Sequence, residues 1–275
     1  MGKLEGKVAL VSGSGRGIGC AVAKKLASEG ARVVVNDLDE GPALETVTNI
    51  QAAGGIAVAC PGSVTETDFG KRYVQVALDT YGGIDIIVNN AGYTWDSVIQ
   101  KMSDEQWQAM IDVHVTAPFR ILRAASDFIR LTAKAEANSG TEIFRKVVNI
   151  SSIAATAGIA GQVNYSSGKA AILGLTHAMA KEWGRYKVNV NAVAFGLIRT
   201  RLTRSWDEEE SFIEIEDRTI KAGVAAQFLQ AVPHLIPLGR SGTPEEAAGA
   251  VYLLCTPESN YISGQVITCA GGLVG

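Results

Sequence analysis

A glycine-rich turn between a buried strand and a helix constrains the fold of this chain more than any other feature. The apolar, β-branched run KVALVSG (7–13) predicts a buried strand, and GCAVAKKLASEG (19–30) predicts a helix. Between them, Gly13, Gly17 and Gly19 are spaced G-x-x-x-G-x-G. Glycines let the backbone approach a pyrophosphate closely, and the helix N-terminus supplies N–H donors. The GK[ST] ending of a P-loop is absent, so the turn predicts a dinucleotide site.

The same strand–helix alternation continues along the chain. We expect strands at 31–37, 56–64, 84–92, 146–152, 188–196 and 264–272, and helices at 43–55, 69–83, 164–183 and 243–255. Residues 104–137 predict one long helix, bent near Pro118. This rhythm is typical of an α/β protein with a doubly wound parallel sheet and helices on both faces, the Rossmann architecture. No break in composition divides the chain, so we expect a single domain over residues 1–275.

Composition excludes several classes of protein. Of the 275 residues, 47% are hydrophobic and 19% are charged, which allows a large core. The net charge of −3 gives no indication of nucleic acid or an anionic membrane as a partner. The four cysteines are scattered without a CxxC pair, so we expect reduced thiols and no metal site. No apolar run reaches the length of a membrane span, and no signal-type stretch precedes the glycine turn, so we expect a cytoplasmic protein.

An acidic residue ends the second predicted strand. Asp37 follows Gly19 by 18 residues, where a carboxylate accepts hydrogen bonds from a ribose diol and repels a 2′-phosphate. This favours NAD over NADP. Two alternatives stay open: Asp37 as a simple turn residue, and Arg16 as a partner for a 2′-phosphate.

Tyr165 and Lys169, in NYSSGK (164–169), lie four residues apart and therefore on one face of a helix. By itself such a pair fits either a solvated helix surface or an acid whose pKa is tuned. A nearby ammonium favours the phenolate and lowers the phenol pKa from its usual value of about 10.

Several motifs then stand in a fixed order: SGSGRGIG (12–19), NNAG (89–92), NISS (149–152), Tyr165-x-x-x-Lys169 and VNAVAFG (190–196). In these the chain resembles the short-chain dehydrogenase/reductase family, from Lys7 to Gly272. The resemblance implies that Tyr165 is the general acid/base, that Lys169 lowers its pKa and holds the nicotinamide ribose, and that Ser152, rather than Ser151, orients the substrate oxygen. It also implies a set of cofactor contacts: Gly13, Arg16, Gly17, Ile18, Gly19, Asp37, Ser63, Val64, Asn90, Ala91, Gly92, Tyr165, Lys169, Gly196, Ile198 and Thr200.

The chain departs from the family pattern at a few positions. His114 replaces the usual Asn in the long helix, where the family holds a proton-relay water. A histidine there could hold that water or pass protons itself, or simply fill space. Ser63-Val64 replaces the usual Asp-Val against the adenine ring, and Phe195 replaces the usual Pro before Gly196.

Two resemblances within the family bear on the substrate. VVVNDL, VHV and ITCAGGLVG are similar to (3R)-hydroxyacyl-CoA dehydrogenase domains of multifunctional enzyme type 2, whereas GQVNY and IPLGRSGTPEEAAGAV are similar to bacterial 3-oxoacyl-ACP reductases. They imply the interconversion of a secondary alcohol and a ketone on an acyl-CoA or acyl-ACP thioester, and Asp37 adds the expectation that the reaction is NAD(H)-dependent. The alternatives are a hydroxysteroid or cyclic-alcohol dehydrogenase and a non-catalytic nucleotide sensor. The family resemblance also implies a homotetramer or homodimer.

The family places its substrate loop at about residues 200–237. There Ile220, Val224, Phe228 and Val232 recur every four residues, which predicts an amphipathic helix that roofs an acyl tunnel or packs on the core. Arg199, Arg201 and Arg204 could meet CoA phosphates or pair with the acidic run 207–210. Trp95 and Gln162, which follow family motifs, are candidates for lining the substrate pocket.

Overall fold

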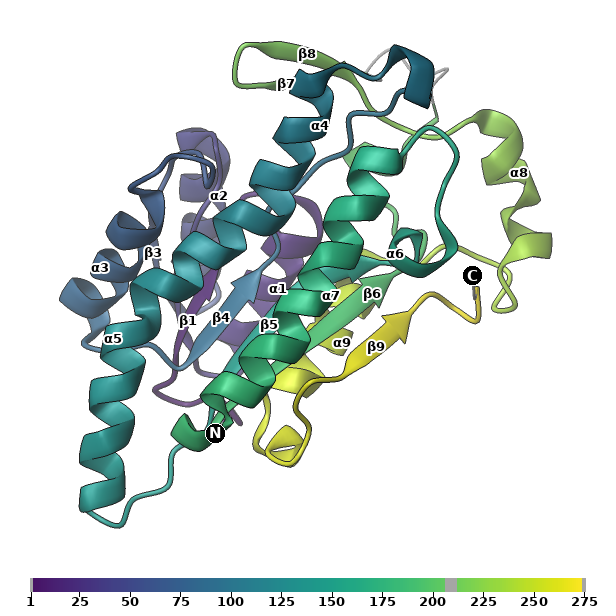
Figure 1. Ribbon diagram of the computed structural model, residues 1–275. Coiled ribbons are helices and arrows are strands. Elements are labelled where there is room, and N and C mark those ends of the chain that lie inside the picture. Colours follow the sequence, from purple (N-terminus) through teal and green to yellow (C-terminus); the bar gives the residue numbers. More distant parts are fainter. Residues whose placement is uncertain (1, 206–211, 274–275) are drawn as a thin grey trace.

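The computed structural model describes residues 2–205 and 212–273. Within them, one parallel sheet runs in the order β3-β2-β1-β4-β5-β6-β9. The expected α/β Rossmann architecture is therefore confirmed (Figure 1). The strands are β1 (Val8–Val11), β2 (Arg32–Val35), β3 (Ile56–Ala59), β4 (Ile86–Asn89), β5 (Arg145–Ser152), β6 (Val188–Phe195) and β9 (Val266–Cys269).

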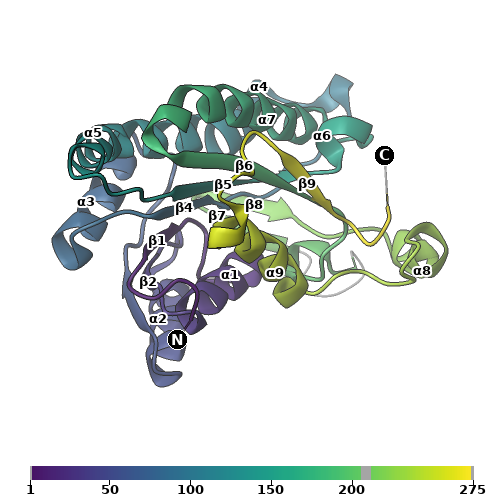
Figure 2. The ribbon, with the colours of Figure 1, turned by 90° about the horizontal axis from the view of Figure 1, so that it is seen from below.

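Helices cover both faces of the sheet, as Figure 2 shows. One face carries α1 (Gly17–Ser28), α2 (Glu40–Ala52) and α9 (Pro244–Cys255), and the other carries α3 (Phe69–Tyr81), α4 (Asp104–Ile111), α5 (Ala117–Asn138) and α7 (Val163–Trp183). Each face has its own apolar core, because parallel strands buried on both sides present apolar side chains in both directions. No helix among the described residues is long and apolar enough to cross a bilayer.

The predicted long helix over 104–137 is interrupted. A π-helical segment (Asp112–Thr116) separates α4 from α5, and Pro118 follows within the first turn of α5. Proline has no backbone N–H to donate to the carbonyl four residues back, so the regular hydrogen-bond ladder cannot continue here. The interruption therefore lies just before Pro118 rather than at it, and it contains His114.

The substrate loop differs from its prediction. Strands β7 (Phe212–Ile215) and β8 (Arg218–Lys221) form an antiparallel hairpin, and α8 begins only at Ala226 and ends at Leu235. Ile220 therefore lies on a strand, and only Phe228 and Val232 of the four-residue stripe lie on the helix. The expected amphipathic helix is present as α8, but it covers only half of the stripe, because residues four apart share a face in a strand as well as in a helix.

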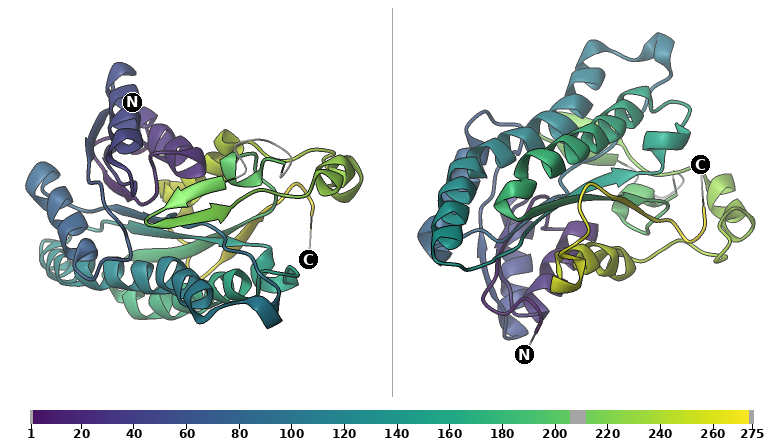
Figure 3. Two further views of the ribbon diagram at one scale, coloured as in Figure 1. Left: turned by 90° about the horizontal axis from the view of Figure 1, so that it is seen from above. Right: turned by 60° about the horizontal axis from the view of Figure 1, so that its bottom comes forward.

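The sheet topology fixes where a ligand can bind. Strand β1 lies between β2 and β4, so successive connections leave it in opposite directions and open a crevice at the carboxyl ends of the strands. Seen from above in Figure 3 (left), the β7–β8 hairpin lies across this edge of the sheet.

Candidate active site

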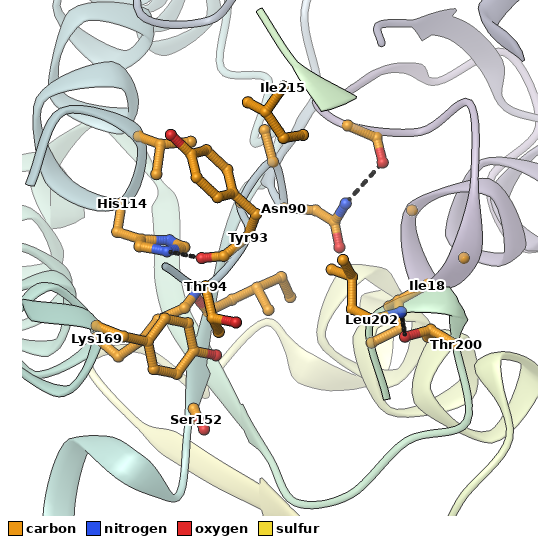
Figure 4. A pocket seen from close by; sticks show the side chains of 18 of the residues that line it. Ile18, Asn90, Tyr93, Thr94, His114, Ser152, Lys169, Thr200, Leu202 and Ile215 are labelled. Atoms are coloured by element: carbon orange, nitrogen blue, oxygen red, sulfur yellow. Dashed lines mark hydrogen bonds between the residues drawn. The ribbon is translucent and has the colours of Figure 1, made fainter. Parts of the chain in front are cut away.

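A cavity of about 990 Å³ occupies the crevice at the carboxyl ends of the strands. Nearly every residue predicted from the sequence lines it: Gly13, Arg16, Gly17, Ile18, Gly19, Asp37, Ser63, Val64, Asn90, Ala91, Gly92, His114, Ser152, Gln162, Tyr165, Lys169, Gly196, Ile198 and Thr200. Figure 4 shows His114, Lys169 and Ser152 on one side of this cavity, and Ile18 and Thr200 on the other. Trp95 is absent from the lining; its ring packs against the β7–β8 hairpin, with Arg218 5.5 Å from the ring centre.

Close packing requires two glycines of the first turn, and a positive φ requires the third. A Cβ on Gly19 would lie 2.1 Å from the Gly13 carbonyl oxygen, and one on Gly13 would lie 2.7 Å from Ala91 Cα. Gly17 has a φ of +54°, and a Cβ there would meet nothing nearer than Thr200 Cγ2 at 3.6 Å. The N-terminus of α1 faces the cavity, which Gly17 and Ile18 line. Unhindered N–H donors beside a carboxylate-bearing strand end fit the pyrophosphate and ribose of a dinucleotide.

Asp37 lies against this turn. A Cβ on Gly15 would come within 2.6 Å of Asp37 Oδ2, so only glycine leaves room for the carboxylate there. Arg16 pairs with both neighbouring carboxylates, at 3.3 Å to Asp37 Oδ1 and 2.8 Å to Asp39 Oδ2. Asp37 is thus held at the cavity wall, with the Arg16 guanidinium already paired.

Tyr165 and Lys169 lie on the first two turns of α7. Asn164 anchors this end of the helix, because its Nδ2 donates to the carbonyls of Trp95 and Gln106, both at 3.0 Å. Lys169 is 5% exposed, and its Nζ donates to the Ile150 carbonyl at 2.9 Å and lies 5.6 Å from the centre of the Tyr165 ring. The solvated-surface interpretation of this pair was therefore wrong.

The acidity of the pair also differs from expectation. Burial raises the pKa of Tyr165 to about 12, and the Ser152 hydroxyl only partly opposes this. Burial likewise lowers the pKa of Lys169 to about 7. The expected lowering of the phenol pKa by Lys169 is not met, since burial outweighs any effect of an amine that is itself half neutral near pH 7.

The two serines at the end of β5 have different surroundings. Ser151 is buried, and its hydroxyl donates to the Lys169 carbonyl at 2.8 Å. Ser152 lines the cavity, its Oγ accepts from the Ala154 N–H at 3.2 Å, and its hydroxyl interacts with Tyr165. Ser152 is therefore the serine available to a ligand.

His114 is buried within the π-helical segment. Its Nε2 lies 2.9 Å from the Tyr93 carbonyl, which can only accept, so Nε2 carries the hydrogen. Its Nδ1 is then a buried lone pair without a partner among the described residues. Burial, and secondarily the Lys169 ammonium, hold the pKa of His114 well below its usual range. The imidazole is therefore neutral near pH 7.

Sequence reasoning missed the part of the lining that comes from the hairpin. Ile215, Glu216 and Arg218 line the cavity, together with Tyr93 and Thr94 after β4. The alternation of β-branched residues around the Glu216–Asp217 turn was the available signal for a hairpin. Arg201 also lines the cavity, whereas the acidic run 207–210 lies outside the described residues.

Comparisons with known proteins agree with this geometry. The family model described as short chain dehydrogenase matches residues 7–211. A 3-oxoacyl-[acyl-carrier-protein] reductase from Synechocystis is 37% identical over 100% of this chain and 99% of its own length. One from Aquifex aeolicus is 36% identical over 98% of each chain.

Solved structures extend the comparison to three dimensions. A gluconate 5-dehydrogenase from Burkholderia cenocepacia, in complex with NADP and tartrate, is 28% identical, with a TM-score of 0.84 over 98% of this chain and 96% of that one. The resemblance to bacterial 3-oxoacyl-ACP reductases is thus confirmed. The chain belongs to the short-chain dehydrogenase family and is an oxidoreductase that uses a nicotinamide cofactor.

Proposed function

We propose that this protein is an NAD(H)-dependent oxidoreductase that interconverts (3R)-hydroxyacyl and 3-oxoacyl thioesters. The observation that carries the proposal is the convergence of Ser152, Tyr165 and Lys169 on the same cavity as the open N-terminus of α1. The thioester substrate is supported by the full-length similarity to 3-oxoacyl-[acyl-carrier-protein] reductases.

Tyr165 acts on the substrate oxygen. A nicotinamide dinucleotide, when bound, supplies or accepts the hydride. A phenol with a pKa of about 12 is protonated at neutral pH, so Tyr165 is ready to donate its proton to a ketone oxygen. Ser152 orients that oxygen through its hydroxyl. Tyr165 is therefore in the protonation state that reduction of a 3-oxo group requires.

Lys169 replenishes the proton of Tyr165, and His114 accepts a hydrogen bond beside it without itself supplying a proton. Lys169, with a pKa of about 7, gains and loses a proton near neutral pH. The free Nδ1 lone pair of His114 supports a role in accepting a hydrogen bond within this relay. Because the imidazole is neutral, it acts as an acceptor at Nδ1 rather than as a cation.

The preference for NAD rests on Asp37. Its carboxylate lies at the cavity wall beside Gly15, where it would accept from a ribose diol and repel a 2′-phosphate. Arg16 is the competing feature, since it would attract that phosphate if it left Asp37 and Asp39. Because one structural relative was solved in complex with NADP, the first measurement to make is the preference of this protein for NADH or NADPH.

The acyl group has an apolar wall available. Ile159, Leu202, Ile215 and Phe228 line the cavity on the side of the substrate loop. These side chains come from four separate segments, so the wall is formed by the fold and not by a single helix. Such a surface suits an acyl chain better than a small polar alcohol.

The experiment is a turnover assay of the purified protein with acetoacetyl-CoA and NADH, then NADPH, beside a panel of cyclic and steroid ketones. The proposal expects reduction of the thioester with NADH preferred, and a loss of about 10³-fold or more in Tyr165→Phe with dinucleotide binding retained. Turnover of cyclic or steroid ketones alone would overturn the thioester assignment. Dinucleotide binding without any turnover would favour the nucleotide sensor. A homodimer or homotetramer remains our prediction, which light scattering on the same sample checks.

A further inference from the structure

The β7–β8 hairpin places a carboxylate at one end of the cavity. The Oε1 of Glu216 accepts from the Ser63 hydroxyl at 2.8 Å and, more weakly, from the Thr65 hydroxyl at 3.4 Å. Its Oε2 accepts from Arg218 Nη1 at 3.1 Å. Glu216 and Ser63 are 153 residues apart in sequence, yet both line the cavity.

The sheet order identifies which end this is. The N-terminus of α1, which follows β1, takes the pyrophosphate, and Asp37, which follows β2, faces the adenosine ribose. The catalytic residues follow β4 and β5 on the other side of β1. The base attached to that ribose therefore lies toward β3, and the loop after β3 carries Ser63, Val64 and Thr65.

We propose that Glu216 recognises the exocyclic amino group of adenine. A carboxylate has about four acceptor positions, of which three are used, one of them weakly, so a further N–H donor can be accepted. Ser63 itself offers only a hydroxyl, and that hydroxyl donates to Glu216. The hairpin thus supplies the acceptor that the β3 loop lacks. This assignment rests on the proposed function, since it requires a nicotinamide adenine dinucleotide in the cavity.

The backbone conformation of Glu216 and the contacts of the turn hold its carboxylate in one place. Glu216 has a φ of +55°, which is unfavourable for a residue other than glycine, asparagine or aspartate. Arg218 braces the turn from the other side, donating to Glu105 of α4 at 2.8 Å. The turn is therefore attached both to the β3 loop and to α4, with the carboxylate directed at Ser63.

The test compares NADH with reduced nicotinamide hypoxanthine dinucleotide, in which a carbonyl replaces the amino group of adenine. Binding of each is titrated by fluorescence and calorimetry to the purified full chain without substrate. The variants are Glu216→Gln and, as the matched control, Glu214→Gln, which lies on the same hairpin but pairs with Thr219 and does not line the cavity. A glutamine offers N–H donors and keeps the size of the side chain.

Wild type and Glu214→Gln are expected to bind NADH about tenfold or more tightly than the hypoxanthine analogue, because a carbonyl would face the carboxylate. Glu216→Gln is expected to bring the ratio close to one or reverse it. A variant that weakens both dinucleotides by the same factor would overturn the assignment, because Glu216 would then only fasten the hairpin. Equal binding of both by wild type would also overturn it and leave the proposed function intact. If neither dinucleotide binds, the proposed function fails and this assignment with it.

Discussion

The imidazole of His114 lies edge-on to the phenol ring of Tyr165, with 5.1 Å between the ring centroids and 84° between the ring planes. The two residues come from the π-helical segment and from α7; His114 is buried and Tyr165 is partly buried. A cation on the imidazole would lie beside the phenol that we propose as the acid/base. The arrangement therefore depends on keeping His114 neutral.

The neutrality of His114 predicts a dependence of stability on pH. Its folded pKa is well below the value of about 6.5 in the unfolded chain, so between these two values the unfolded chain binds more protons. Stability is lost as the pH falls below about 6.5. We expect the melting temperature to fall less steeply between about pH 7 and about pH 5.5 in His114→Asn than in wild type. The exposed His177 provides the control, and a slope that changes equally in His177→Asn would contradict this role for His114.

Gly92 makes room for the imidazole. A Cβ at position 92 would lie 2.3 Å from His114 Cε1 and 2.8 Å from its Nδ1, so Gly92→Ala must displace the ring. We expect a destabilisation of about 1–3 kcal/mol and a fall in kcat of about tenfold or more, measured by urea unfolding and turnover.

The control for this change is Gly174→Ala, since a Cβ at this position in α7 meets nothing within 4 Å. It should leave turnover unchanged and raise helix stability slightly. Adding His114→Ala to Gly92→Ala should restore much of the lost stability, because the clash is removed. Additive losses in the double variant would show that Gly92 acts through something other than the ring.

The buried amine of Lys169 predicts a second dependence of stability on pH, at neutral to alkaline pH. Its pKa falls from an ordinary 10.5 to about 7, so between these values the unfolded chain binds more protons than the folded one. Stability therefore rises with pH over this range. Lys169→Met should show a smaller rise in melting temperature than wild type between about pH 7 and about pH 8.5, together with loss of turnover. Lys146, whose pKa burial also lowers, is present in both wild type and Lys169→Met. If the melting temperature rises equally with pH in the two proteins, groups such as Lys146, and not Lys169, cause the rise.

Cofactor preference should respond to Asp37. Asp37→Ser removes the carboxylate that repels a 2′-phosphate and releases Arg16 from one of its two ion pairs. We expect the ratio of kcat/KM for NADPH to that for NADH to rise by about 10–100-fold. Asp39→Ser, which removes the other and more exposed partner of Arg16, should shift the ratio less. A wild-type protein that already prefers NADPH would contradict the role given to Asp37.

Local patterns in the sequence were enough for the fold, whereas the core of the site was predicted only through the resemblance of several ordered motifs to a known family. The strand–glycine turn–helix at 7–30 and the four-residue spacing of Tyr165 and Lys169 depend only on the periodicity of adjacent residues. Asp37 at the end of a strand followed in the same way. These features survive in the structure because each is decided within one element or one turn.

Tertiary packing decided the rest. The spacing of Ile220 and Phe228 fits a strand as well as a helix. Only the pairing of β7 with β8 placed Ile220 on a strand, while Phe228 lies on α8. The acidity of Tyr165 depends on burial, which no spacing reveals. The contact between Glu216 and Ser63 joins segments 153 residues apart. The sequence by itself determined what each element is and which residues its faces carry; the tertiary structure decided solvent exposure and distant neighbours, because these depend on how the elements pack.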